Sequence, residues 1–274
     1  MSVPIILISR CIQTGAPCHK SCKELYTKAI VRRPGRDFAS GITTSNLGQP
    51  DFVKALEQHA AYCEALIRCG VELTVLDADE RYPDGCFVED TAVVNSRVKV
   101  ISRPGAATRR GEEEAIAQVL AGYGPVESIT APGTLEGGDV LRAESHYFIG
   151  VSERTNREGA GQLADILTKH GFTSSFVRVE AGLHLKSDIA YLGNGNFIST
   201  PVFSHVAHPA NTIILDPDES YSANCLRVND FLLIARGFPK SKRQILELGY
   251  NIIELDMSEF RKMDGGLTCL SLLY

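Results

Sequence analysis

Short runs of apolar residues, each following a polar segment, recur five times along the chain. The runs are TAVV, VLRA, IAYL, LRVN and LSLLY, and acidic, imidazole, amide or thiol side chains precede them. The pattern predicts pairs of short strands, with a reactive residue at the start of the first strand of each pair. The spacing of roughly 40–50 residues is typical of propellers and similar repeat arrays. Because equivalent points of a closed radial array lie near its axis, we expect these polar side chains to meet at one site.

Apolar residues recur at helical spacing in four longer segments. The strongest segment begins near Pro50 and ends at Gly70, residue types that favour the start and the end of a helix. The other three segments are residues 112–124, 154–171 and 241–249. The predicted order is strand, strand, helix, strand, so we expect an α/β fold. No linker rich in Pro, Gly or Ser divides the chain, which indicates one domain.

Two of these helices carry a residue pair with the spacing of a capping box. In this motif a Ser or Thr and a Glu or Gln three residues later satisfy free backbone N–H groups. The pairs are Thr155 with Glu158 and Ser241 with Gln244. We therefore predict that Thr155 and Ser241 are the N-caps of the third and fourth helices.

The composition argues against several classes of protein. Of 274 residues, 44% are hydrophobic and 22% are charged, as in soluble globular proteins. The 28 basic and 33 acidic residues argue against nucleic-acid binding and suit a small cationic substrate. No apolar run reaches the length of a transmembrane helix, and the run after Met1 is a poor signal peptide. The eight cysteines lack the spacing of a disulfide framework, so we expect a cytoplasmic location.

The start of the chain contains four residues of metal-ligand type, namely Cys11, Cys18, His19 and Cys22. Thiolate and imidazole suit zinc, but zinc ribbons and fingers use two well-spaced pairs, and here the spacing of Cys18 and Cys22 stands alone. We therefore expect no metal site here. Residues 1–29 are predicted to form an N-terminal extension, and chain termini are often poorly ordered.

Three residues have the chemistry of covalent hydrolysis. Cys269 follows Gly265 and Gly266, whose missing side chains allow a sharp turn and the close approach of a ligand. Its thiol attacks carbon only as the thiolate, which requires a nearby cation. His184 can act as general acid and base, and Glu136 can orient it as the acid of a triad does. The structural alternatives are a small buried hydrophobe, a core histidine and a solvated turn residue.

Asp84, Glu89 and Asp90 lie in the otherwise apolar segment YPDGCFVEDTAVV. Buried acids are destabilising unless they are paired, and a guanidinium with five planar donors satisfies a carboxylate cluster well. The partner is either a substrate guanidinium or an internal arginine. Arg109 and Arg154 each stand beside a predicted helix start, where they can hold a substrate carboxylate or act as surface charges.

Eight segments together resemble one family. They are RPGRDFASGITTSNLGQPDF, YPDGCFVEDTAVV, SRPGAATRRGE, LEGGDVL, SERTNREGA, LHLKS, SYSANC and MDGGLTCLSL. In this order they resemble the dimethylarginine dimethylaminohydrolases of the amidinotransferase, or pentein, superfamily, and agreement of this extent is more specific than any single motif. The resemblance implies a five-bladed α/β propeller of ββαβ units with pseudo-fivefold symmetry, forming a single catalytic domain over residues 30–274.

By this resemblance, Cys269 matches the nucleophile, His184 the proton donor and acceptor, and Glu136 the acid partner of the histidine. The implied reaction is hydrolysis of Nω-methylated arginines to citrulline and methylamine or dimethylamine. The thiolate attacks the guanidino carbon, and water then hydrolyses the thiouronium intermediate. The resemblance implies no metal and no organic cofactor. The expected partner is a small cationic amino acid, without nucleic acid or membrane, and a homodimer is compatible with it.

Seven further residues match substrate-binding positions of the family. Three contact the guanidinium, two bind the α-carboxylate, and two offer backbone carbonyls to the α-amine, one of these in a lid loop that contains Gly41. In that order they are Asp84, Glu89 and Asp90, then Arg109 and Arg154, then Ile42 and Met263. Met263 replaces a branched aliphatic residue, a mild departure because the backbone makes the contact.

Two other functions fit part of the pattern. The nearer one is an arginine deiminase or citrulline hydrolase of the same superfamily, but deiminases usually carry a histidine before the nucleophile, where this chain has Thr268. A pocket for one extra methyl group discriminates by only about 1–3 kcal/mol, so the sequence leaves the preferred guanidine open. The more remote one is a non-catalytic pentein that binds macromolecules, which has no need of Cys269, His184 and Glu136 together.

Overall fold

Five small sheets of three strands form the framework of the protein. The computed structural model describes residues 25–180, 182–206 and 211–274. The strands are β1 (Lys28–Arg32), β2 (Glu72–Leu76), β3 (Ala92–Val94), β4 (Lys99–Ile101), β5 (Val126–Ser128), β6 (Val140–Ala143), β7 (His146–Val151), β8 (Thr173–Arg178), β9 (Ile189–Gly193), β10 (Asn196–Ser199), β11 (Thr212–Ile214), β12 (Leu226–Val228), β13 (Phe231–Ala235), β14 (Asn251–Leu255) and β15 (Leu272–Leu273). The sheets have the orders β15-β1-β2, β3-β4-β5, β6-β7-β8, β9-β10-β11 and β12-β13-β14.

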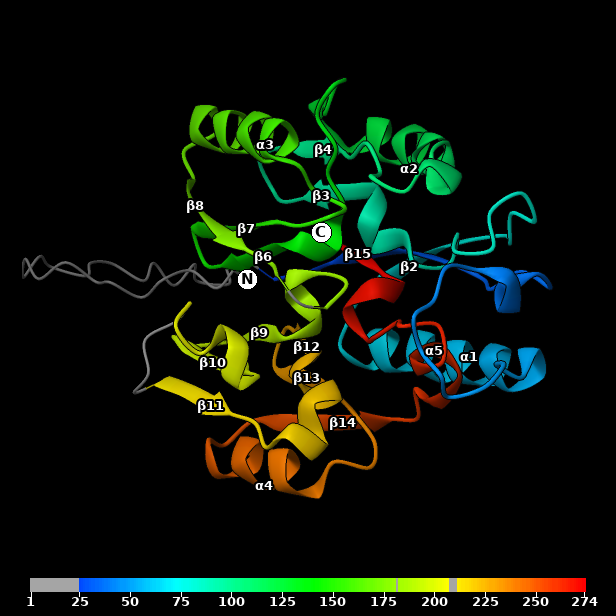
Figure 1. Ribbon diagram of the computed structural model, residues 1–274, viewed down its shortest axis with the longest axis vertical. Helices are drawn as coiled ribbons and strands as arrows, with labels where there is room; N and C mark the ends of the chain where they lie inside the picture. Colours follow the sequence, from blue (N-terminus) through cyan, green and yellow to red (C-terminus); the bar gives the residue numbers. More distant parts are fainter. Residues whose placement is uncertain (1–24, 181, 207–210) are drawn as a thin grey trace, which may run out of the picture.

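All five sheets have the same strand directions. The first two strands pair antiparallel, and the third runs parallel to the second. A parallel pair needs a crossover connection, and in four units a helix supplies it. These helices are α1 (Phe52–Arg68), α2 (Glu112–Leu120), α3 (Arg157–Lys169) and α4 (Pro239–Glu247). They lie at the periphery, while β15 lies near the middle of the molecule (Figure 1). The predicted α/β fold and its four helices are confirmed.

A short 3-10 turn precedes the first strand of every sheet. The turns are η2 (Val88–Thr91) before β3, η5 (Gly137–Asp139) before β6, η6 (Leu185–Ser187) before β9, η9 (Pro217–Ala223) before β12 and η10 (Thr268–Leu270) before β15. The polar residues predicted to start the strands lie on or beside these turns, so that prediction is wrong by one turn. His184, for example, has an extended backbone and immediately precedes η6. The apolar residues form the strands, whereas the polar side chains bond to neighbouring turns.

Hydrogen bonds join the five turns into a closed ring, which we call the turn ring. Each turn is bonded to the next one along the chain, and the last is bonded to the first. The bonds run from Gly138 N to Asp90 Oδ1 (2.8 Å), Leu185 N to Asp139 Oδ1 (3.0 Å), Asn224 Nδ2 to Lys186 O (2.9 Å), Thr268 N to Asn224 Oδ1 (3.0 Å) and Thr268 Oγ1 to Glu89 Oε2 (2.8 Å). The turns therefore position one another across the sequence.

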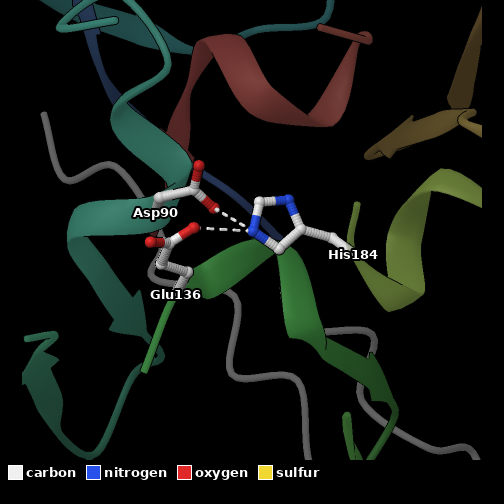
Figure 2. A group of neighbouring side chains, drawn as sticks. All are labelled: Asp90, Glu136 and His184. Carbon is white, nitrogen blue, oxygen red and sulfur yellow. Dashed lines mark hydrogen bonds and ion pairs between the residues drawn. The ribbon is translucent and has the colours of Figure 1, made fainter. Parts of the chain in front are cut away.

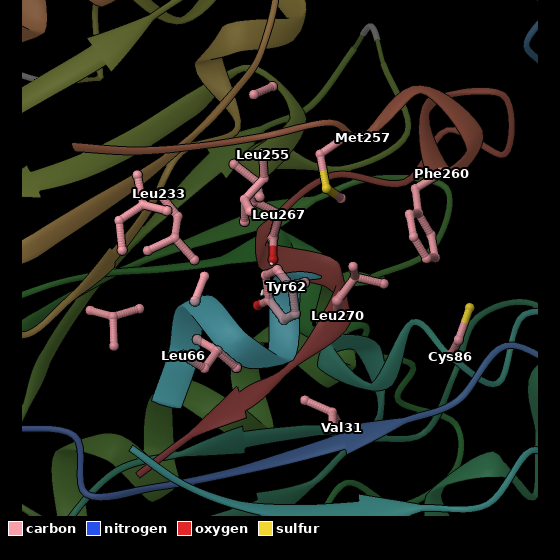
Figure 3. Packing of buried hydrophobic residues seen from close by; sticks show 14 of the residues in the cluster. Val31, Tyr62, Leu66, Cys86, Leu233, Leu255, Met257, Phe260, Leu267 and Leu270 are labelled. Carbon is pink, nitrogen blue, oxygen red and sulfur yellow. Dashed lines mark hydrogen bonds between the residues drawn. The ribbon is translucent and has the colours of Figure 1, made fainter. Parts of the chain in front are cut away.

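The largest apolar cluster holds the C-terminal segment in place. It packs α1 against β1, β13 and β14, and against the short helix α5 (Ser258–Arg261) (Figure 3). Tyr62 of α1 is fully buried, donates a hydrogen bond to Leu267 O at 2.9 Å and shares another with Ser271 Oγ at 2.7 Å. Because a buried side chain of this size stabilises the fold by about 1.5–3 kcal/mol, the segment that carries Cys269 is firmly anchored.

The N-cap prediction for α3 is wrong by one residue. Asn156 is the N-cap, and its side chain accepts a hydrogen bond from Gly159 N at 2.8 Å. The Thr155 hydroxyl instead accepts from Glu136 N at 3.1 Å. Asn is as good an N-cap as Thr or better, which leaves Thr155 available to bind the site residue Glu136.

The N-cap prediction for α4 is also wrong. The helix begins at Pro239, because proline is favoured in the first helical position, so Ser241 lies inside the helix. The free N–H groups of Lys240 and Ser241 donate to the Glu219 carboxylate at 2.9 and 2.7 Å. A carboxylate from another part of the chain thus performs the capping.

The first described residues pair with the C-terminal segment of the chain. Lys28 and Ala29, predicted to end an extension, belong to β1, and Thr27 N donates to Tyr274 O at 2.9 Å. Cys11, Cys18, His19 and Cys22, which we expect not to form a metal site, lie outside the described residues. Within those residues, none of the helices combines the length and the apolar character needed to span a membrane.

Candidate active site

His184 is held by two carboxylates from neighbouring turns. Asp90 lies in η2, and Glu136 immediately precedes η5. The Nε2 atom of His184 lies 2.8 Å from Glu136 Oε2 and 3.8 Å from Asp90 Oδ1 (Figure 2). All three side chains are buried, Glu136 completely. The fold thus brings together three predicted site residues that are far apart in the sequence.

The two carboxylates determine the charge on His184. Burial by itself lowers the pKa of an imidazole, but Asp90 and the hydrogen bond with Glu136 raise the pKa of His184 to about 9. Burial raises the pKa of Asp90, but the charges of His184 and Arg109 outweigh it and lower that pKa to about 2. The imidazole is therefore protonated at neutral pH. It can donate a proton to a leaving group and then accept one from water.

The same three residues are the one metal-ligand cluster in the described part of the chain. Their ligand atoms lie within 4.8 Å of one another. A metal would need a neutral imidazole nitrogen, however, and the Nε2 atom of His184 already carries the proton shared with Glu136. Asp90, Glu136 and His184 are therefore better suited to keep a proton on the imidazole than to bind a metal cation.

Two glycines allow these groups to approach. A Cβ on Gly138 would stand 2.6 Å from both Cγ and Nδ1 of His184, and 3.0 Å from Asp90 Oδ1. A Cβ on Gly137 would stand 2.0 Å from the carbonyl oxygen of Glu89. The space left by the missing side chains of Gly137 and Gly138 is therefore occupied by the η2 backbone and by the imidazole.

The Cys269 thiol lies beside the carboxylates and is half-buried. Its Sγ atom accepts a hydrogen bond from Gly266 N at 3.3 Å. Burial, followed by the negative charges of Glu89 and Asp90, raises the pKa of the thiol to about 12. In the free protein the thiol is therefore neutral. A cation bound against these carboxylates opposes their charges and favours the thiolate.

Glu89 is buried within the turn ring and has two partners. Lys186 Nζ lies 2.6 Å from Glu89 Oε1, and Thr268 Oγ1 donates to Oε2 at 2.8 Å. Burial raises the pKa of Glu89, while the nearby ammonium opposes that rise. Lys186 had no predicted role, although it stands two residues after His184 in the motif LHLKS.

Asp84 connects the carboxylate cluster to the predicted lid loop. Ile42 N lies 3.1 Å from each carboxylate oxygen of Asp84. A Cβ on Gly41 would stand 2.4 Å from Asp84 Oδ1, so glycine is needed for this approach. Ile42 itself is 37% exposed, whereas Met263 is 3% exposed and packs in the core. Burial raises the pKa of Asp84.

A second carboxylate holds the same loop. Asp264 accepts hydrogen bonds on Oδ2 from Thr44 N (2.5 Å), Thr44 Oγ1 (3.0 Å) and Thr43 Oγ1 (3.2 Å). Asp264 has a left-handed backbone with φ of 57°, which Asp tolerates better than most residues. The lid loop is thus fixed to the segment that carries Cys269. The sequence offered no signal for this contact.

Arg109 is an internal residue and not a surface charge. It is 5% exposed, and its Nη1 atom lies 2.5 Å from Asp90 Oδ2. Its Nη2 atom donates to Glu112 Oε2 at 2.8 Å and to Phe87 O at 3.0 Å. Burial raises the pKa of Glu112 to about 7 in spite of this arginine. The internal arginine, one of the two partners considered for the carboxylate cluster, is thus present as Arg109, and it also pairs with Glu112 in the first turn of α2.

Arg154 and Asp139 complete the surroundings of His184. Arg154 Nη1 lies 3.6 Å from Glu136 Oε1, and its side chain is 16% exposed. Asp139 is fully buried, accepts from Leu185 N and accepts from Ser152 Oγ at 2.6 Å. Asp139 fixes the turn after His184, but a single sequence does not distinguish it from other turn acids.

Comparisons with known proteins identify the class and then the family. The α/β fold of small sheets and the thiol, imidazole and carboxylate groups define a class of cysteine-dependent hydrolases. A family model described as "N,N dimethylarginine dimethylhydrolase, eukaryotic" matches residues 49–194. The N(G),N(G)-dimethylarginine dimethylaminohydrolase of Pseudomonas aeruginosa is 46% identical, over 91% of this chain and 100% of that protein. The chain belongs to the dimethylarginine dimethylaminohydrolase family.

Other relatives and solved structures agree with this assignment. The Streptomyces coelicolor protein with the same name is 37% identical over 89% of this chain and 95% of its own length. A citrulline complex of a variant of the P. aeruginosa enzyme has a TM-score of 0.88 at 46% identity, covering 92% of this chain and 100% of that one. The N-terminal domain of ArgZ, a cyanobacterial arginine dihydrolase, has a TM-score of 0.80 at 20% identity, covering 90% and 96%, and supports the pentein fold alone.

Proposed function

We propose that this protein hydrolyses Nω-methylated arginines to citrulline and methylamine or dimethylamine through a covalent intermediate on Cys269. The observation that carries the proposal is a neutral thiol beside buried carboxylates that also hold a protonated His184. This combination suits a cationic substrate whose charge activates the nucleophile. The citrulline complex and the S-methyl-L-thiocitrulline adduct of the P. aeruginosa enzyme support the same ligand class.

The first half of the reaction forms the thiouronium. The substrate guanidinium binds against Asp84 and Asp90, and its positive charge lowers the pKa of the Cys269 thiol, which releases its proton to solvent water and becomes a thiolate. The thiolate attacks the guanidino carbon and forms a C–S bond. His184 then donates its proton to the departing nitrogen, the C–N bond breaks, and methylamine or dimethylamine leaves. Glu136 and Asp90 keep His184 charged until this step.

The second half releases citrulline. His184, now neutral, accepts a proton from a water molecule that attacks the same carbon. The C–S bond of the tetrahedral intermediate breaks, the remaining hydroxyl proton passes to the sulfur, and the carbonyl of citrulline forms. His184 ends the cycle protonated. No group from outside the chain, other than water, is required for this balance of atoms and charge.

The remaining predicted residues would bind the amino-acid end of the substrate. We assign the α-carboxylate to Arg154, whose side chain is partly exposed, and to Arg109, which would share a donor with the internal carboxylates. The α-amine would bind the carbonyl oxygens of Ile42 and Met263 beneath the lid loop. Glu89 would add its negative charge to that of Asp84 and Asp90 on the guanidinium side of the site, while Lys186 and Thr268 hold its carboxylate in place.

We also infer that the five sheets are blades of one closed propeller with pseudo-fivefold symmetry and form a single catalytic domain. The identical strand directions and the turn ring support this arrangement. Its functional consequence is that turns of four blades supply Asp90, Glu136, His184 and Cys269, while the fifth turn, η9, joins the turn ring through Asn224.

Citrulline release tests the proposal. The substrates are asymmetric dimethylarginine, monomethylarginine and arginine, and the variants are Cys269→Ser and the matched control Cys63→Ser on α1. We expect turnover of the methylated substrates in the wild type and the control, and none in Cys269→Ser. Turnover of arginine alone would assign the protein to the deiminases. Full activity in Cys269→Ser would exclude this thiol as the nucleophile.

A further inference from the structure

A cavity of about 530 Å³ runs along the first strands of the five sheets, and we call it the axial cavity. Residues of β3, β6, β9, β12 and β15 line its wall. Its mouth is formed by the connections that follow these strands, which supply Ser96, Glu144, Asn194, Asn229 and, before β1, Tyr26. Its floor is formed by residues of the turn ring, namely Glu89, Lys186 and Thr268.

The axial cavity is separate from the candidate active site. Cys269, His184 and Glu136 do not line it, and of the predicted substrate-binding residues only Glu89, which lies on the floor, is shared between the two. The floor is closed by the ion pair of Lys186 with Glu89 and by the hydrogen bond from Thr268 to Glu89. A molecule in the axial cavity would therefore lie on the opposite side of the turn ring from the Cys269 thiol.

The mouth of the axial cavity has an excess of positive charge. Arg97, Arg142 and Arg227 line it, against the single acid Glu144. Glu144 accepts a hydrogen bond from the Tyr191 hydroxyl at 2.9 Å. The guanidinium groups of Arg97 and Arg142 lie 4.7 and 5.4 Å from the centre of the Phe172 ring, which holds two of the three cations together.

Arg227 is the most informative of these residues. Among the described residues its guanidinium has no hydrogen-bond or ion-pair partner, although the residue is half-buried and its charge acts on the neighbouring Tyr191 hydroxyl. The chain makes room for it, because a Cβ on Gly193 would stand 1.5 Å from Arg227 Nη1, and Gly193 has a positive φ of 92°. A planar group of five donors, placed at the mouth of a cavity without an internal acceptor, is suited to bind an anion.

The wall of the axial cavity is apolar below this mouth. Val93, Val140, Leu141, Ala190 and Leu272 are among the residues that line it. A cavity of this volume is within the range that holds small organic ligands. We propose that the axial cavity binds a small organic monoanion, with its carboxylate or equivalent group on Arg227 and its apolar body along the first strands. This site is distinct from the one that binds the substrate.

Isothermal titration calorimetry with octanoate tests this site. Octylamine, with the opposite charge, and acetate, without the apolar body, are the control ligands. The variants are Arg227→Gln, Arg227→Lys and the matched control Arg243→Gln, which removes an exposed arginine of α4. Because Arg227 has no internal partner to lose, its variants should unfold at the wild-type temperature. Saturating citrulline in a parallel titration separates this site from the active site.

We expect one octanoate to bind per chain, with the same affinity in the presence of citrulline. Arg227→Gln should weaken binding by about tenfold, since one charge-assisted hydrogen bond is lost, while Arg227→Lys weakens it less and Arg243→Gln leaves it unchanged. Equal binding of octylamine would overturn the assignment, and so would full affinity in Arg227→Gln or competition by citrulline. No binding of octanoate at millimolar concentration would exclude the proposed ligand class. These outcomes do not depend on which guanidine the enzyme hydrolyses.

Discussion

Gly138 faces the imidazole of His184 so closely that a single added methyl group would displace the ring. The Cβ of an alanine would stand 2.6 Å from the Cγ and Nδ1 atoms, whereas ordinary van der Waals contact begins at 3.4 Å. The ring must therefore move by about 0.8 Å. The bond from His184 Nε2 to Glu136, 2.8 Å long, would then lengthen beyond hydrogen-bonding distance or lose its alignment.

The expected effect on catalysis is large and the effect on stability is small. Misplacing a catalytic group by about 1 Å can reduce the rate by about 100-fold, so we expect kcat of Gly138→Ala to fall by about that factor. Overpacking destabilises by about 1–3 kcal/mol, and the lower entropy of the unfolded alanine chain offsets about 0.4–1 kcal/mol of this. Gly138 does not have a positive φ, so the backbone itself tolerates alanine.

The assay compares Gly138→Ala with Gly161→Ala, which makes the same change in α3. Apart from its chain neighbours and the backbone of its own helix, no atom lies within 4 Å of a Cβ added at Gly161, so that variant should gain about 0.5–1 kcal/mol and keep its kcat. Kinetics with asymmetric dimethylarginine, thermal unfolding and citrulline binding are measured on both. If folded Gly138→Ala, still able to bind citrulline, turns over within threefold of the control, the contact with His184 has no role in catalysis.

Three further predictions concern charge and the lid loop. The pKa of His184 is raised from 6.5 to about 9, so the stability that its ion pairs provide is complete below pH 6.5 and is lost as the pH rises through about 9. Urea unfolding of the wild type should show this loss of stability, and urea unfolding of His184→Gln should not. Because the pKa of Cys269 is raised to about 12, its alkylation by iodoacetamide should accelerate about tenfold per pH unit up to pH 10, and a plateau near pH 8 would contradict this. Asp264→Ala, which frees Thr43 and Thr44, should raise KM several-fold with a smaller change in kcat, whereas Asp264→Asn keeps an acceptor and should lie nearer the wild type.

The parts of the fold that could be predicted from the sequence are those with local patterns. The apolar spacing between Pro50 and Gly70 predicts α1 because every contact that forms the helix lies within a few residues. The N-cap prediction failed for α3, where two neighbouring residues can each cap the helix. Thr155 and Asn156 are both good caps, and only the distant Glu136, which bonds to Thr155, decides between them.

The missed residues act across the turn ring. Lys186, Asp139 and Asn224 lie in segments that the repeat pattern had singled out, but their partners are 38 to 97 residues away in sequence. One sequence indicates which acids are available and not which base each one meets. The same limit applies to Glu112, which looks like an acid that favours a helix start and instead forms a buried ion pair with Arg109.

Because β15 pairs with β1, the last strand of the chain and the first belong to one sheet. The same ring of sheets can therefore form from a chain that starts at a different point of the ring. Thr27 N and Lys28 N both donate to Tyr274 O, at 2.9 and 2.8 Å, so the two ends of the described chain meet within one sheet. A circular permutant that joins Tyr274 to Thr27 through a short flexible linker, and opens between two other sheets, would retain every bond of the turn ring. The nucleophile could then lie in the middle of the chain with its surroundings unchanged, because the chemistry depends on the ring and not on the order of its segments.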